Sequence, residues 1–151
     1  MRTLSPITFT NTVTIDRPLA AVFAFLAQFE NLPRWNYAIS QTRKITSGPV
    51  RVGSQYRQTR TLPRRSEEAF EVTEFEPDRR VSIRGTLGPF PAEVTYVLDR
   101  TGDATTLTNA VDLQTPGLLR AVAPWATARI RSAVAANLDS LKQILERDGS
   151  T

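Results

Sequence analysis

The chain contains neither cysteine nor histidine. These absences exclude disulfide bonds, thiolate nucleophiles, zinc sites built from cysteine and histidine, haem ligation by histidine, and Ser-His-Asp triads. The sequence also has no GxGxxG, GxxxxGK[ST] or GxSxG motif. Any general acid or base must therefore be Asp, Glu, Lys, Tyr or a bound water. We expect no metal and no cofactor, and no catalytic residue is assigned.

Long apolar runs are missing as well. The longest, residues 19–27, has about nine residues, whereas a membrane-spanning helix needs about 20. The first six residues lack the apolar segment and the small-residue cleavage site of a signal peptide. These features predict a cytoplasmic protein without a transmembrane segment.

The basic charge is spread over the chain. The net charge is +4 and the sequence pI is about 10.1, with nearly all of the basic residues being arginine. Arginines alternate with acidic residues and form no stripe, so we expect no nucleic-acid partner. The densest cluster is Arg57, Arg60, Arg64 and Arg65. It surrounds an expected hairpin turn and is interpreted as a solvated tip rather than a phosphate clamp.

Composition and length predict one domain spanning residues 1–151. Hydrophobic residues make up 40% of the 151 residues and charged residues 23%, both near the average for globular proteins. The chain is long enough to bury a core and shows no repeat, linker or low-complexity segment.

The central pattern is that of a strand-rich meander. Threonine alternates with larger residues from 7 to 15, which predicts a half-buried strand with Phe9, Val13 and Ile15 on one face. Residues 16–37 predict two short helices. Turn signals then divide the chain into six antiparallel strands. The expected ranges are 39–45, 53–61, 67–75, 80–86, 92–99 and 105–113.

The C-terminal part predicts one long amphipathic helix, opening near Thr115 and interrupted or kinked at Pro124. Its apolar residues recur every three or four positions, and the helix would have roughly thirty residues and a length of about 45 Å. The apolar stripe comprises Leu119, Val122, Ala126, Ile130, Val134, Leu138, Leu141 and Leu145. With the strands, it defines an α+β class.

This order resembles the helix-grip fold, in which a curved seven-stranded antiparallel sheet wraps around a long C-terminal helix, with two short helices after strand 1. Six segments of the sequence carry a more specific resemblance: 13–18, 22–26, 29–36, 52–56, 75–81 and 133–146. They resemble the polyketide cyclase/dehydrase and lipid-transport family of the START-like (SRPBCC) superfamily, which also contains the birch pollen allergen. Members of this group include ligand carriers, aromatase/cyclases, hormone receptors, ring-hydroxylase subunits and co-chaperones.

A strongly curved sheet cannot close completely against one straight helix, so we expect a ligand cavity between them. Its lining should be one parity of each strand plus the helix stripe, unless a β-bulge exchanges the two faces. The candidate ligand-binding residues are Trp35, Tyr56, Gln58, Phe70, Val72, Ile83, Phe90, Tyr96, Asn109, Val111, Trp125 and Ile130.

Several of these candidates have a second interpretation. Trp35 fits a packing role equally well, and Trp125 either guards the cavity mouth or fills a helix kink. Phe90, within the Gly- and Pro-rich stretch 85–91, is either the tip of a gating loop or part of an irregular hairpin. The polar candidates are more informative, because a buried polar group without a partner costs about 1–3 kcal/mol.

Three functions fit the sequence. The favoured one is binding of a hydrophobic small molecule, such as a lipid, polyketide or aromatic metabolite. The second is an aromatase/cyclase-type enzyme without metal, which requires an acid–base pair in the cavity drawn from Tyr56, Tyr96, Arg60 and Glu71. The third is a protein-interaction module similar to the co-chaperones. The sequence leaves a homodimer open.

Overall fold

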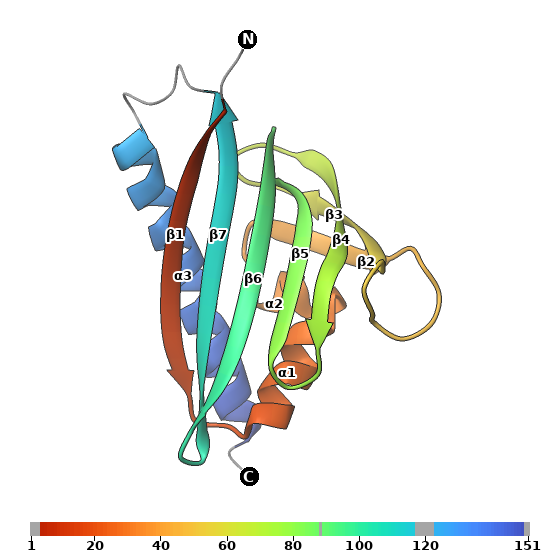
Figure 1. The fold of residues 1–151 in the computed structure, drawn as a ribbon, viewed down its shortest axis with the longest axis vertical. Coiled ribbons are helices and arrows are strands. Elements are labelled where there is room, and N and C mark those ends of the chain that lie inside the picture. Colours follow the sequence, from red (N-terminus) through yellow and green to blue (C-terminus); the bar gives the residue numbers. More distant parts are fainter. Residues whose placement is uncertain (1–3, 88, 117–122, 150–151) are drawn as a thin grey trace.

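The computed structural model describes residues 4–87, 89–116 and 123–149. One antiparallel sheet contains seven strands in the order β1-β7-β6-β5-β4-β3-β2 (Figure 1). Neighbouring strands follow one another along the chain, except that β7 returns to pair with β1. The strands are β1 (Leu4–Ile15), β2 (Ile39–Lys44), β3 (Gln55–Arg60), β4 (Ser66–Glu76), β5 (Arg80–Leu87), β6 (Phe90–Thr101) and β7 (Ala104–Pro116). All of the predicted strands are confirmed.

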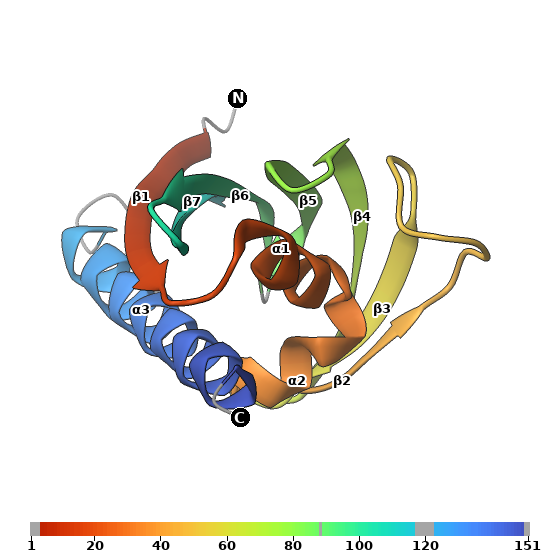
Figure 2. The same ribbon diagram turned by 90° about the horizontal axis from the view of Figure 1, so that it is seen from below.

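The helices lie on the concave side of this sheet (Figure 2). They are α1 (Leu19–Ala27), the 3-10 helix η1 (Phe29–Asn31), α2 (Leu32–Trp35) and α3 (Ala123–Asp148). Helix α1 buries Val22, Phe23 and Leu26, as their helical spacing predicts. The α+β helix-grip prediction is therefore confirmed.

The predicted start of the long helix is wrong. Thr115 belongs to β7, where it pairs with Ser5 of β1, because the long first strand extends the pairing to Pro116. The predicted stripe residues Leu119 and Val122 lie outside the described residues. Pro124 occupies the first turn of α3, where its missing N–H breaks no helical hydrogen bond, so the described helix continues through it.

The sheet curves near Gly85, where any side chain would clash with the neighbouring strand β4. A Cβ atom on Gly85 would lie 2.5 Å from the carbonyl oxygen of Ala69 and 2.7 Å from the Cβ of Phe70. Glycine at this position therefore permits the close approach of β5 to β4. A bulge between Val72 and Glu74 adds bend on the same pair of strands.

The interior has two unlike halves along α3. In what we call the closed half, Leu138, Leu141 and Leu145 are fully buried against strand residues and the short helices. In the open half, Ile130 and Val134 are only half-buried, packed on a smaller cluster. That smaller cluster contains Ile7, Phe9, Ala92, Val111 and Leu113.

Candidate functional site

The concave face carries most of the predicted lining, since strand residues of one parity share it. Strand register decides which of these residues are neighbours on adjacent strands. Asn109 pairs with Tyr96, and Val111 pairs with Val94. Phe70 pairs with Tyr56 on one side and with Gly85 on the other. Eight predicted residues are buried: Trp35, Tyr56, Gln58, Phe70, Val72, Tyr96, Asn109 and Val111. Ile83, Phe90 and Ile130 are half-buried. Their role in ligand binding stays a prediction.

Trp125 differs from the other candidates. Its side chain is 65% exposed, and the guanidinium carbon of Arg129 lies 5.1 Å from its ring centroid. The indole ring thus faces solvent at the first turns of α3, stacked under a cation. It fills no kink, since α3 runs on past Pro124.

Aromatic side chains fill the interior beside the short helices. Tyr56 stacks on Phe70 with ring centroids 4.9 Å apart, and Phe29 of η1 meets both rings edge-on. Trp35 of α2 meets the ring of Tyr96 edge-on at 6.4 Å. Four of the predicted lining residues therefore form two close aromatic pairs, and Trp35 has the packing contact that its alternative interpretation predicts.

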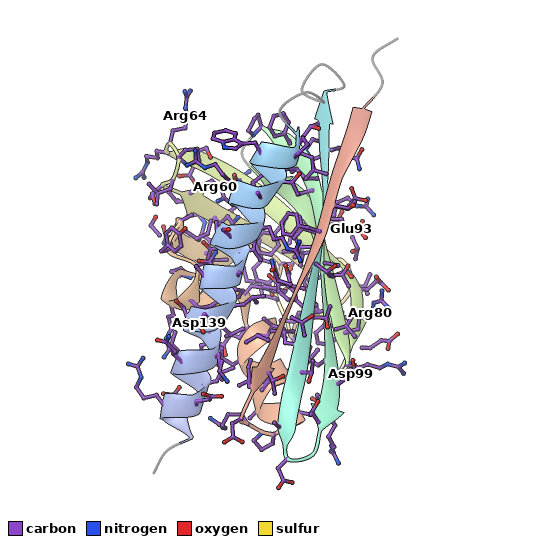
Figure 3. The ribbon with its side chains drawn as sticks, turned by 90° about the vertical axis from the view of Figure 1, so that its left-hand side faces the viewer. Arg60, Arg64, Arg80, Glu93, Asp99 and Asp139 are labelled. Atoms are coloured by element: carbon purple, nitrogen blue, oxygen red, sulfur yellow. The ribbon has the colours of Figure 1, made fainter. Side chains whose placement is uncertain are left out.

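A buried ion pair lies at the end of β3 and β4. The Nε of Arg60 is 2.8 Å from Oε2 of Glu68, and Nε2 of Gln58 donates to Oε1 of the same carboxylate at 2.9 Å. Only 11% of the Arg60 side chain and 2% of the Glu68 side chain are exposed. Figure 3 shows Arg60 level with the N-terminal half of α3, and Arg64 above it.

This pair corrects two expectations. Arg60 was expected on a solvated tip with Arg57, Arg64 and Arg65; those three are exposed, but Arg60 is not. Glu71 was an acid–base candidate, but it has the opposite parity to Phe70 and Val72 and lies on the outer face, while Glu68 lies on the inner face. The missed signal was the period of two, which puts Glu68 with Phe70.

Several buried polar atoms on the inner side have no hydrogen-bond partner among the described residues. They are Tyr56 Oη, Gln58 Oε1, Asn109 Oδ1, Thr42 Oγ1 and Asn137 Oδ1. Asn137, next to Leu138 on α3, is a residue that the sequence analysis did not single out. Each such atom costs about 1–3 kcal/mol unless a partner is supplied.

Both predicted tyrosines are neutral phenols at physiological pH. Burial, and secondarily the charge of Glu30, raise the pKa of Tyr56 to about 12. Burial also raises the pKa of Tyr96. A neutral phenol donates and accepts hydrogen bonds but does not act as a base.

Within the described part of the chain, no group of three or more Asp or Glu residues is placed to hold a metal ion. No helix among residues 4–87, 89–116 and 123–149 is long and apolar enough to cross a membrane.

Fold and sequence together define the class. The sequence profile of the family described as "Polyketide cyclase / dehydrase and lipid transport" matches residues 6–146. The protein therefore belongs to that family, and with it to the START-like superfamily. A search of curated protein sequences gives no match.

Solved structures share the fold at low sequence identity. The Zhui aromatase/cyclase from a Streptomyces species is 14% identical with a TM-score of 0.78, and 95% of each chain is covered. A Thermus thermophilus protein is 15% identical with a TM-score of 0.76, covering 95% of this chain and 99% of its own. A Staphylococcus aureus protein of unknown function is 8% identical with a TM-score of 0.80, covering 98% of each chain. At such identities the similarity shows the fold alone.

Proposed function

We propose that this protein is a single-domain carrier or receptor that binds a hydrophobic small molecule between the concave face and α3, in the open half and against the hydroxyl of Tyr56 where the closed half begins. The observation that carries the proposal is that the inner side holds both half-buried apolar residues and buried polar atoms that lack partners among the described residues. Ile130, Val134 and Phe90 offer apolar contact that the described residues do not complete. Ligand sites combine an apolar lining with a few placed polar groups in this way.

The unpartnered atoms favour one kind of ligand. Gln58, Asn109 and Asn137 each present an amide oxygen, which accepts hydrogen bonds. A ligand with hydroxyl groups on an apolar, preferably aromatic, frame would supply the donors. A saturated fatty acid would satisfy none of these oxygens along its chain. Hydroxylated polyketides and flavonoid-like metabolites therefore fit better than simple lipids.

Thermal unfolding against fatty acids, sterols, aromatic polyketides and flavonoids tests the proposal. A ligand at a hundred times its dissociation constant stabilises the folded state by about 2.7 kcal/mol, which raises the midpoint by several degrees. We expect the hydroxylated aromatic compounds to give the largest shift. No shift with any class, and no molecule co-purifying by mass spectrometry, would contradict ligand binding.

A pair of matched variants locates the site. Tyr56→Phe deletes a buried hydroxyl that has no described partner, so the free protein should gain about 1 kcal/mol of stability while the ligand-induced shift decreases. Tyr37→Phe makes the same chemical change on a side chain that is 60% exposed, and should alter neither quantity. Equal behaviour of the two variants would place the ligand away from Tyr56.

The Arg60–Glu68 pair favours a second candidate, an aromatase/cyclase-type reaction. It places a carboxylate and a guanidinium on the inner side, where they could orient a carbonyl and exchange a proton with a folded poly-ketone. The test is the rate of ring closure or dehydration of such a substrate. Glu68→Gln should abolish the rate, and Tyr37→Phe should leave it unchanged. An unchanged rate in Glu68→Gln would exclude this role for the carboxylate.

A further inference from the structure

A hollow of about 370 Å³ lies on the convex face of the sheet, over β2, β3 and β4. It is on the side of the sheet opposite to the proposed ligand, because Tyr56 and Gln58 point inward while Arg57 between them is exposed. The residues that border it are Gln41, Arg43, Arg57, Gln58, Thr59, Arg65 and Glu67.

The hollow is positively charged. Three arginines and one glutamate give its border a formal charge of +2. The carboxylate of Glu67 accepts a hydrogen bond from the Thr59 hydroxyl at 2.9 Å. No described carboxylate forms an ion pair with Arg43, Arg57 or Arg65.

Other arginines of the same sheet are arranged differently. Arg79, Arg80 and Arg84 each lie within 3.8 Å of a glutamate oxygen. Arg100 of β6 is also exposed and has no ion pair among the described residues, so what distinguishes the hollow is that three such arginines border it together.

Strand register places two of these arginines close together, and their repulsion lowers the stability of the fold. Arg43 of β2 and Arg57 of β3 are directly opposite each other in the antiparallel pair. Directly opposed residues have Cβ atoms about 5 Å apart, and like charges in such a pair are destabilising. Arg65, immediately before β4, adds a third guanidinium to the same hollow. An anion between these groups would remove the repulsion.

We propose that this hollow is a binding site for a phosphate group, which revises the interpretation of Arg57 and Arg65 as parts of a solvated tip. The planar fork of a guanidinium donates two parallel hydrogen bonds to phosphate oxygens, and the formal charge matches a phosphate dianion. The volume suits a small phosphate ester. A soluble ester and a lipid headgroup share this chemistry, and the experiment separates them.

The first experiment is calorimetric titration with inorganic pyrophosphate, at low and at physiological salt, together with thermal unfolding. The wild type should bind one pyrophosphate saturably and unfold at a higher temperature in its presence. Arg57→Gln should weaken binding at least tenfold. The matched control Arg79→Gln removes the same charge from an arginine whose side chain is 77% exposed and paired with Glu76, and should bind as the wild type does.

A second readout distinguishes a binding site from a merely structural arginine. Without pyrophosphate, Arg57→Gln should unfold at a higher temperature than the wild type, because the repulsion with Arg43 is gone. Addition of pyrophosphate should then leave its midpoint unchanged. Arg43→Gln should behave in the same way and replaces Arg57→Gln if that variant does not fold.

The source of the phosphate is tested with glycerol 3-phosphate and with phosphatidylcholine vesicles that contain phosphatidic acid. Arg57-dependent binding of the soluble ester alone supports a free metabolite, and Arg57-dependent sedimentation with vesicles supports a headgroup. Absence of binding to pyrophosphate, ester and vesicles would overturn the proposal. Equal weakening in Arg57→Gln and Arg79→Gln would also overturn it, because it would show attraction to net charge only.

Discussion

The closed and open halves of the interior are built by the same helix and sheet, yet the α3 side chains are fully buried in one and only half-buried in the other. In the closed half α3 contributes three fully buried leucines, and aromatic side chains from η1 and α2 complete the packing. In the open half the stripe continues with Ile130 and Val134, which are only half-buried, and the buried ion pair of β3 and β4 lies level with this N-terminal half of α3. The closed half thus contributes most to the stability of the fold, and the open half is where we propose that the ligand binds.

Breaking the ion pair should have the largest effect. Arg60→Met removes the guanidinium from a carboxylate of Glu68 that stays buried beside Gln58, so the free energy of unfolding should fall by about 3–5 kcal/mol. The double variant Arg60→Met/Glu68→Leu should recover most of the loss, since it removes both charged groups of the described pair. Urea denaturation measures both. Equal losses in the single and double variants would mean that packing of the arginine stem, rather than charge pairing, is what matters.

A matched pair of truncations compares the two halves directly. Leu141→Ala removes a fully buried side chain and should cost about 2–5 kcal/mol. Ile130→Ala removes the same number of atoms from a half-buried site and should cost about 1 kcal/mol. Both values come from urea denaturation.

Ligand binding should reverse that order. Ile130→Ala should lower affinity for the compound that shifts the wild-type midpoint, whereas Leu141→Ala should bind it unchanged once stability is accounted for. Equal stability losses in the two variants would contradict the division into halves.

The sequence was sufficient for the architecture because alternation and turn residues act locally. Threonine at every second position defined the parity of β1, and Gly or Pro marked most of the turns. The features that it missed depend on pairing between segments. From the sequence, Arg60 is expected to be exposed at a hairpin turn, but the register of β3 and β4 places it beside Glu68. The sequence of Thr115 and Pro116 is typical of a helix start, but in the structure both residues belong to β7 and pair with β1.

The candidate site was predictable in part for the same reason. Parity alone placed Tyr56, Gln58 and Asn109 on the inner face, where the structure has them buried. It could not place Trp125, because the exposure of a helix residue depends on where that helix crosses the sheet. Parity does separate Glu68 from Glu71, because Glu68 shares the parity of Phe70, but only the register of β3 and β4 brings Glu68 to Arg60.

The smallest predicted effect concerns Glu146, whose hydrogen bonds join the C-terminal part of α3 to Asp16, the residue after β1. Glu146 accepts hydrogen bonds from Lys142 Nζ and from the backbone N–H of Asp16, and its pKa is lowered, chiefly by the bond from Lys142. A lowered folded-state pKa stabilises the fold above the unfolded-state pKa, and the stability is lost as the pH falls through the folded-state pKa. Glu146→Gln should therefore be slightly less stable than the wild type at neutral pH.

The difference between Glu146→Gln and the wild type should vanish in acid. Thermal unfolding between neutral and acidic pH measures it. Glu76→Gln is the control, because its carboxylate is exposed and lies 3.7 Å from Arg79. A pH-independent difference for Glu146→Gln would show that its carboxylate acts through packing rather than charge.

The pairing of β1 with β7 has a consequence for how the chain is made. Leu4 pairs with Pro116, so the first strand leaves the ribosome long before its neighbour in the sheet exists. Contacts so distant in sequence slow folding and prolong the exposure of unpaired strand edges. The exposed threonines at 8, 10, 12 and 14 keep one face of that strand polar from residue 8 to residue 14. We read this alternation as protection of the nascent chain against premature association.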